Sequence, residues 1–137
     1  MAEGILKARA EAAGLDVTGH SAGTHGYHIG EPPDPRAIRI AGERFVDIKS
    51  QKARKLSPQD FRDYDMIVAL DSGHLAFIER MDPGGGAETG LLMAFSGKPR
   101  DVPDPYYEGD DAFIRAFEMI EQGVDGLMAY MGTKASA

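Results

Sequence analysis

Hydrophobic and polar positions alternate along the chain with periods that predict helices and strands in turn. Apolar residues recur at three-to-four spacing from Met1 to about Gly14, which predicts a helix that ends at this glycine. No Ser, Thr, Asp or Asn precedes this helix to cap its first turn. The strongest helix prediction begins at Asp110 or Asp111 and rests on an apolar stripe at alternating steps of four and three: Phe113, Phe117, Ile120, Val124, Leu127 and Met131.

Two further helices are predicted from their opening residues. Asp34 before Pro35 is a favourable start, because Asp caps the first turn and proline suits the first helical position, and this helix should run to about Phe45. The segment Ser57-Pro58-Gln59-Asp60 opens a short helix by the same logic. A fourth helix is predicted over residues 74–81, before a run of proline and glycine.

Three segments have the composition of strands. Met66–Leu70 is an unbroken apolar run, typical of a strand buried on both faces. Leu15–Gly23 is rich in small and β-branched residues, and Leu91–Phe95 is a plausible third strand. Helices alternating with strands indicate an α/β fold, a three-layer domain with a parallel sheet. We expect a single domain over residues 1–131 and a frayed tail over 132–137.

Composition and charge exclude several classes of function. The 137 residues include 15 Lys and Arg against 22 Asp and Glu, and a net charge of −7 argues against a nucleic-acid partner. No apolar run approaches the roughly 20 residues of a membrane span, and no secretory leader opens the chain. We therefore expect no membrane partner and a cytoplasmic location. The chain has no cysteine, which excludes disulfides and any cysteine nucleophile among these residues.

One Asp-Pro pair has features of a chemical site. Unlike Asp34-Pro35, the segment Asp104-Pro105-Tyr106-Tyr107 does not open a helix. Proline stiffens this loop and pushes the preceding Asp towards extended geometry, so a carboxylate and two phenols project together. That arrangement suits a general acid beside an aromatic slot. From composition alone, the alternative is a turn with two half-buried tyrosines.

Other polar residues allow weaker predictions. His20, His25 and His28 match no metal-binding spacing, so we expect no metal. Asp71 directly follows the apolar strand and could support a site or cap a helix. A cluster of basic residues is expected to be a solvated face: Lys49, Lys52, Arg54 and Lys55.

Five segments, in order, resemble one known family. They are Met1-Ala2-Glu3-Gly4 at the start of a helix, then SAGTHGYHIGEPPDPRA, QKARKLSPQDF, YDMIVALD and DVPDPYY. Over residues 1 to about 131 the chain is thereby similar to the low-molecular-weight protein tyrosine phosphatases. The resemblance implies a phosphotyrosine phosphatase I-like sheet of four parallel strands with flavodoxin-like topology.

The resemblance also implies that a central element is absent. In the family the first, central strand leads into a phosphate-binding loop of Cys, five residues, Arg, Ser or Thr, and Pro, usually followed by Met-Ala-Glu. This chain begins at that Met, so we expect the first strand and the loop to be missing. The strands at Leu15–Gly23 and Met66–Leu70 should then pair directly or expose edges that favour strand-swapped or aggregated oligomers.

Site roles follow from the same resemblance. Asp104 matches the general acid and base of the family, which uses neither metal nor cofactor. The substrates implied are phosphotyrosine proteins or small aryl phosphates. Residues that match the walls of the aromatic slot or its supports are Tyr27, His28, Tyr106, Tyr107, Ser21 and Asp71.

These matches leave more than one functional interpretation. The family hydrolyses phosphotyrosine through a phosphocysteine, and this chain should be inactive because it lacks the nucleophilic Cys and the phosphate-binding Arg. It is then either a truncated product of an active tyrosine phosphatase or a non-catalytic binding or regulatory module. A relative of the arsenate reductases and an unrelated small α/β ligand-binding domain are the remaining alternatives.

Overall fold

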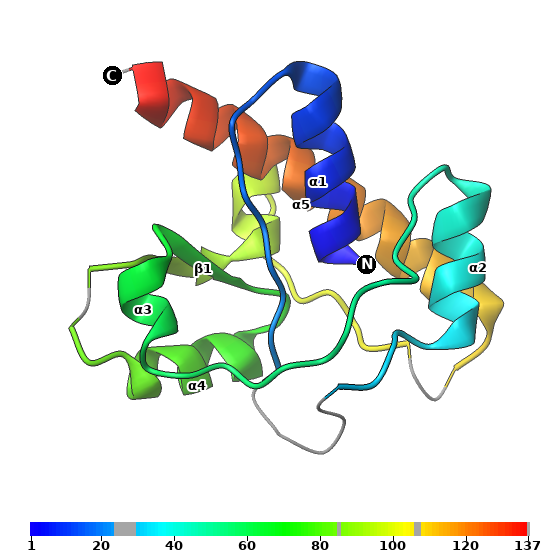
Figure 1. Cartoon of the computed structure of the whole chain (residues 1–137), viewed down its shortest axis with the longest axis horizontal. Helices are drawn as coiled ribbons and strands as arrows, with labels where there is room; N and C mark the ends of the chain where they lie inside the picture. The colour runs from blue at the N-terminus through cyan, green and yellow to red at the C-terminus, as the bar shows by residue number, and fades with distance from the viewer. Residues whose placement is uncertain (24–29, 85, 106–107, 137) are drawn as a thin grey trace.

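The computed structural model describes residues 1–23, 30–84, 86–105 and 108–136 and contains helices before, between and after two strands (Figure 1). The α/β fold with a parallel sheet is therefore confirmed. The elements are α1 (Ala2–Ala13), α2 (Pro35–Glu43), α3 (Asp60–Asp63), β1 (Met66–Ala69), α4 (Ser72–Met81), β2 (Glu88–Leu91), the 3₁₀ helix η1 (Leu92–Ser96) and α5 (Asp110–Ser136).

Helix ends follow the capping residues of the sequence. Gly14 ends α1 in the left-handed conformation, with φ of 67°, as glycine allows. Asp34 caps α2 by accepting a 2.8 Å hydrogen bond from the backbone N–H of Arg36. Asp71 caps α4 by accepting one of 2.7 Å from the N–H of His74, so α4 begins before the predicted residue 74. The last helix, α5, continues to Ser136, through the segment predicted to fray.

The parallel sheet is formed by β1 and β2, with Met66 opposite Glu88 and Ala69 opposite Leu91. This confirms the strand predicted at 66–70. The strand predicted at Leu91–Phe95 is wrong, because the strand ends at Leu91 and the following apolar residues form η1. A short apolar run does not by itself distinguish a strand from a buried helical turn.

The strand predicted over Leu15–Gly23 is also not formed. Among the described residues, this segment makes one β-bridge, in which Gly23 pairs in parallel with Lys55. It does not pair with β1 or β2. A strand needs a neighbour to satisfy its backbone, so the segment stays extended without becoming part of the sheet.

Helices cover both faces of β1 (Figure 1). On one face, Met66 and Val68 pack against the larger apolar cluster, which α1, α2, η1 and α5 build. On the other face, Ile67 and Ala69 pack against a smaller cluster that includes Leu56, Phe61 and Ile78. Successive side chains of a strand point to opposite faces, so β1 belongs to both clusters. The predicted stripe of α5 is confirmed, since its residues from Phe113 to Leu127 are buried in the larger cluster.

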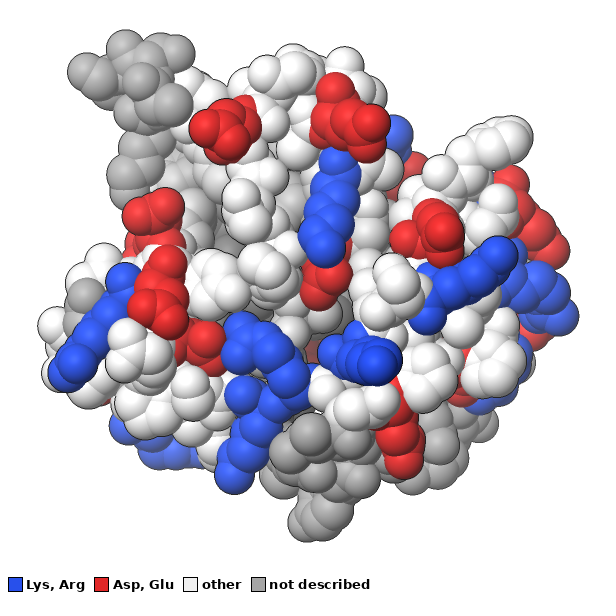
Figure 2. All heavy atoms as spheres, viewed as in Figure 1, with Lys and Arg blue, Asp and Glu red and all other residues white. Residues whose placement is uncertain are grey.

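Charges are interspersed on the surface, and Figure 2 shows acidic and basic side chains side by side on the face viewed. Within the described part of the chain, no helix has the length and apolar character that crossing a bilayer requires.

The larger cluster depends on a close approach between α5 and η1. A Cβ added to Gly126 would overlap the backbone carbonyl of Phe95, and one added to Gly123 would press on Leu92 and on the sulfur of Met93. Gly132, on the same helix, has no atom within 4 Å of where its Cβ would lie. The two glycines therefore set the distance between the helices, whereas Gly132 has room for a side chain.

Substituting Gly126→Ala should lower the free energy of unfolding by about 1–3 kcal/mol, because the backbone of η1 must move away. The matched control Gly132→Ala should leave stability unchanged or raise it by up to about 1 kcal/mol, the difference in helix propensity. Urea unfolding followed by circular dichroism measures both variants. Equal stabilities of the two variants would contradict the proposed close packing.

Asp60 is the buried charged residue of the described chain, with a relative exposure of 6%. Its carboxylate accepts hydrogen bonds of 3.1 and 3.2 Å from the guanidinium of Arg54 and one of 2.9 Å from the backbone N–H of Ser57. Burial raises the pKa of Asp60, but these hydrogen bonds outweigh it and hold the pKa below its ordinary value of 3.8. Asp60 thus ties the start of α3 to the segment 54–57.

The pKa of Asp60 is lower in the folded state than in the unfolded state. The ionised carboxylate should therefore stabilise the fold fully at pH values above the unfolded pKa, and this contribution should be lost as the pH falls through the folded pKa. Asp60→Asn should reduce the free energy of unfolding by about 1–3 kcal/mol at neutral pH. This difference from the wild type should shrink below about pH 4. The control is Asp63→Asn, an exposed carboxylate that should matter little. Urea unfolding at several pH values would contradict the assignment if the difference did not change with pH.

Candidate functional site

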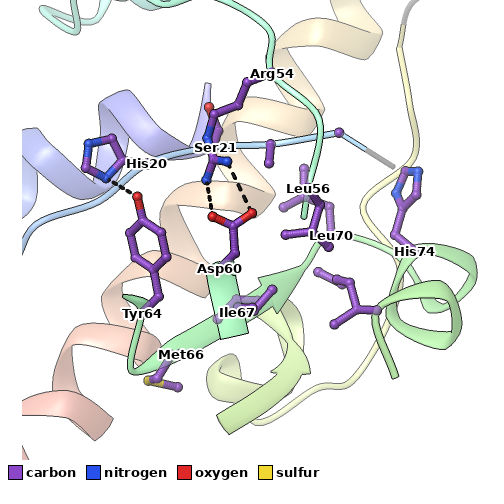
Figure 3. Close-up of a pocket in the computed structure, with 15 residues that line it drawn as sticks. His20, Ser21, Arg54, Leu56, Asp60, Tyr64, Met66, Ile67, Leu70 and His74 are labelled. Carbon is purple, nitrogen blue, oxygen red and sulfur yellow. Dashed lines mark hydrogen bonds and ion pairs between the residues drawn. The ribbon is translucent and has the colours of Figure 1, made fainter. Parts of the chain in front are cut away.

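A groove of about 250 Å³ lies along the edge of β1 that does not face β2 (Figure 3). We call it the β1 groove. One side is the extended segment His20–Gly23, and the other is the strand with the residue after it, Met66–Leu70. Between them lie residues of the smaller apolar cluster, including Leu56 and Ile78. The two segments expected to pair or to expose edges are therefore separated, and no described strand pairs with this edge of β1.

Paired polar side chains line the groove (Figure 3). The hydroxyl of Tyr64 lies 3.0 Å from Nδ1 of His20, and the two rings meet edge to face. The Arg54–Asp60 ion pair also lines it. Arg54 was predicted to lie in a solvated basic face; its side chain is 39% exposed and also pairs with Asp60. Arg54 lies outside the helices and strands and Asp60 begins α3, so no periodicity within one element indicates the pair.

Several loops converge at the carboxyl end of β1, where ligand sites of α/β sheets gather. The carbonyl of Leu70 accepts a 2.8 Å hydrogen bond from the N–H of Val102. Asp101 accepts bonds of 2.9 and 3.0 Å from the backbone N–H and the hydroxyl of Ser72. The segment that leads to Asp104 is therefore held at the strand end, and the side chain of Asp104 is exposed there.

Asp71 and Ser21 are both engaged in local contacts. Besides capping α4, the carboxylate of Asp71 lies 3.1 Å from Nδ1 of His74, which lines the groove. Ser21 donates from its backbone N–H and from its hydroxyl to one carboxylate oxygen of Glu3, each over 2.7 Å. Burial raises the pKa of Glu3, but the bonds from Ser21 and Lys7 outweigh it and lower the pKa. Ser21 therefore fastens the side of the groove to α1.

The aromatic slot expected from the sequence falls largely on residues that the structure does not describe. Tyr27, His28, Tyr106 and Tyr107 lie outside the described residues, as does His25. Among the predicted site residues, the described ones are Ser21 beside the groove, and Asp71 and Asp104 on segments that meet at the carboxyl end of β1. The residues that sequence reasoning missed are Tyr64 and Asp60, together with the role of Arg54.

Comparisons with known proteins identify the family. The sequence profile of the family described as "Low molecular weight phosphotyrosine protein phosphatase" matches residues 1–137. The chain is 39% identical to a low molecular weight protein-tyrosine-phosphatase of Streptomyces coelicolor, over 94% of this chain and 83% of that protein.

Solved structures agree with this assignment. A protein tyrosine phosphatase of Entamoeba histolytica is 26% identical, with a TM-score of 0.91 over 98% of this chain and 88% of that one. Wzb of Vibrio vulnificus, solved in complex with benzylphosphonate, is 27% identical, with a TM-score of 0.82 over 92% of this chain and 85% of that one. The 137-residue chain therefore belongs to the low molecular weight phosphotyrosine protein phosphatase family.

Proposed function

We propose that the chain supplies the scaffold and the general acid of a phosphotyrosine phosphatase, and that its 137 residues alone do not hydrolyse aryl phosphates. Support for the scaffold and the general acid comes from the family and from one structural observation: the segment bearing Asp104 is hydrogen-bonded to the carboxyl end of β1. Support for the lack of hydrolysis comes from the sequence, which contains no cysteine. Benzylphosphonate, bound to the related Wzb, is a benzyl group on a phosphonate and suits the proposed class of aryl phosphate substrates.

The chemistry that the family resemblance implies needs two kinds of residue. A thiolate attacks phosphorus, the bond between phosphorus and the tyrosyl oxygen breaks with its electron pair leaving on oxygen, and an Asp protonates that oxygen. The Asp then takes a proton from a water that attacks the phosphorus of the phosphocysteine, and the phosphorus–sulfur bond breaks to release inorganic phosphate and the thiolate. Asp104 can supply both proton transfers, because free tyrosine has a pKa near 10 and is a poor leaving group unless protonated. Nothing in these 137 residues supplies the thiolate.

The β1 groove supports the interpretation that an element is missing. A further strand beside β1 would satisfy its open edge and would lead into a loop at the same end of the sheet as Asp104. That is the position from which the family's phosphate-binding loop would face the general acid. Phosphotyrosine proteins as substrates, a cytoplasmic location and strand-swapped or aggregated oligomers remain predictions.

The 137-residue chain should show no turnover of para-nitrophenyl phosphate, because a general acid assists only a reaction that has a nucleophile. Fusing to Met1 a strand followed by Cys, five residues, Arg, Ser and Pro should create activity. The control is the same fusion with Ser in place of that Cys. Stopped assays for released phosphate measure all three proteins.

Two outcomes would contradict this proposal in different ways. Turnover by the unfused chain that Asp104→Asn abolishes would show that another nucleophile operates. A fused chain that unfolds cooperatively but remains inactive would instead favour a non-catalytic binding or regulatory module.

In the fused, active chain, Asp104→Asn should lower kcat/KM, which reports the steps up to release of the phenol, by about 10²–10⁴-fold on phenyl phosphate, because the leaving oxygen departs unprotonated. The loss should be smaller on para-nitrophenyl phosphate, whose phenolate is a weaker base and needs a proton less. The matched control Asp111→Asn changes an exposed carboxylate at the start of α5 and should leave kcat/KM unchanged. Equal losses on the two substrates would count against a general-acid role.

A further inference from the structure

A second hollow, of about 480 Å³, lies where the end of η1 and the turn after it meet the middle of α5. We call it the α5 hollow. It shares no lining residue with the β1 groove, so it is a separate feature of the surface. The residues that line it are Phe95, Ser96, Lys98 and Arg100 on one side, and Gln122, Asp125 and Gly126 of α5 on the other.

Both sides of the α5 hollow are held in place by the fold. Gly126 brings α5 so close to η1 that an added Cβ would overlap the backbone there. Gly97 ends η1 in the left-handed conformation, with φ of 85°. Three residues later the chain is fixed again at Asp101, which accepts the two hydrogen bonds from Ser72. The segment 98–100, which its central proline stiffens, is therefore anchored at both ends beside α5.

Two basic side chains of the hollow lack a partner. Lys98 and Arg100 are exposed and make no ion pair or hydrogen bond with any described residue. Like charges that line one small hollow repel each other, so a bound anion would stabilise their arrangement. Other arginines of the chain differ in this respect, because an acidic side chain pairs with each of Arg9, Arg36, Arg39 and Arg54.

The remaining polar groups of the hollow leave its positive charge available. Asp125, the acidic residue of the lining, turns to Arg9 of α1, whose Nε lies 3.2 Å away. The hydroxyl of Ser96 donates to the carbonyl of Met93 over 2.6 Å. Gln122 is exposed and contributes an uncharged amide. The groups that face a ligand are therefore chiefly hydrogen-bond donors: a guanidinium, an ammonium and an amide.

We propose that the α5 hollow binds the dianionic phosphoryl group of a small phosphate monoester. Such a group has three terminal oxygens that accept hydrogen bonds, and Lys98 and Arg100 together match its two charges. The half-buried ring of Phe95 offers an apolar surface to the organic part of the ester. The whole chain, with a net charge of −7, repels anions at long range, so binding depends on this local arrangement. The proposal does not require phosphatase activity.

The test titrates the unfused 137-residue chain with phenyl phosphate at pH 8, where the ester is a dianion because its second pKa is about 6. Two-dimensional NMR follows the backbone amides, and sodium chloride of equal ionic strength is the blank. We expect saturable shifts at the amides of Lys98, Arg100 and Gln122 that chloride does not produce. An absence of saturation beyond the blank, or saturable shifts at other amides only, would overturn the site.

Variants test the two cations. Lys98→Gln and Arg100→Gln should each weaken binding by about threefold or more, since each removes a charge-assisted contact at an exposed site. Arg100→Lys should retain part of the affinity, because it keeps the charge but loses the planar fork. The matched control is Arg115→Gln, which removes an exposed cation of α5 outside the hollow. Equal weakening by this control would overturn the site, because binding would then follow overall charge; urea unfolding verifies that each variant is folded.

Two further probes distinguish the ester from other anions. Inorganic phosphate supplies the dianion without the ring and should bind about threefold or more weakly than phenyl phosphate. Methyl phenyl phosphate keeps the ring but carries one charge, and it should bind more weakly by a similar factor. If inorganic phosphate bound as tightly as phenyl phosphate, the choice of an ester would be wrong. If the singly charged diester did so, recognition of a dianion would be wrong. Inorganic phosphate cannot be hydrolysed, so its binding is measured independently of any phosphatase activity.

Discussion

A strand whose two faces are both covered has to satisfy its backbone along two edges, and this constraint on β1 organises the rest of the molecule. Met66 and Val68 pack against the larger apolar cluster, which includes residues of α5, while Ile67 and Ala69 belong to the smaller cluster, which includes residues of α3 and α4. Both helical layers are therefore positioned by one four-residue strand. One edge is satisfied by β2, and the other borders the β1 groove. Two strands alone are marginally stable, so the helical layers must supply most of the stability of this sheet.

The same strand positions the candidate site. Its carboxyl end binds the segment before Asp104 through Leu70 and Val102, and the Asp101–Ser72 bonds fix that segment to the first turn of α4. Asp71 and Asp101 accept hydrogen bonds from backbone N–H groups, and the side chain of Asp104 is exposed at the surface. A carboxylate used for proton transfer has to be reachable by a substrate but precisely held by its backbone. The anchoring at the end of β1 provides both conditions.

Sequence patterns predicted the elements whose cause is local. The glycine that ends α1, the Asp34-Pro35 start of α2 and the apolar stripe of α5 act within a few residues, and each is observed. Leu92–Ser96 was misassigned as part of a strand because its conformation depends on Gly123 and Gly126, some thirty residues later. Leu15–Gly23 was misassigned because a strand forms only if another strand lies beside it. For the site, family motifs led to Asp104, but the Arg54–Asp60 and His20–Tyr64 pairs are tertiary contacts without a sequence periodicity.

The chain has the fold of its family, and its 137 residues contain no cysteine. The family fold persists in a chain without cysteine because none of the contacts that position the helices around β1 involves a thiol. In the proposed function the nucleophile would follow a strand. Among the described residues, β1 has one edge that no strand pairs with.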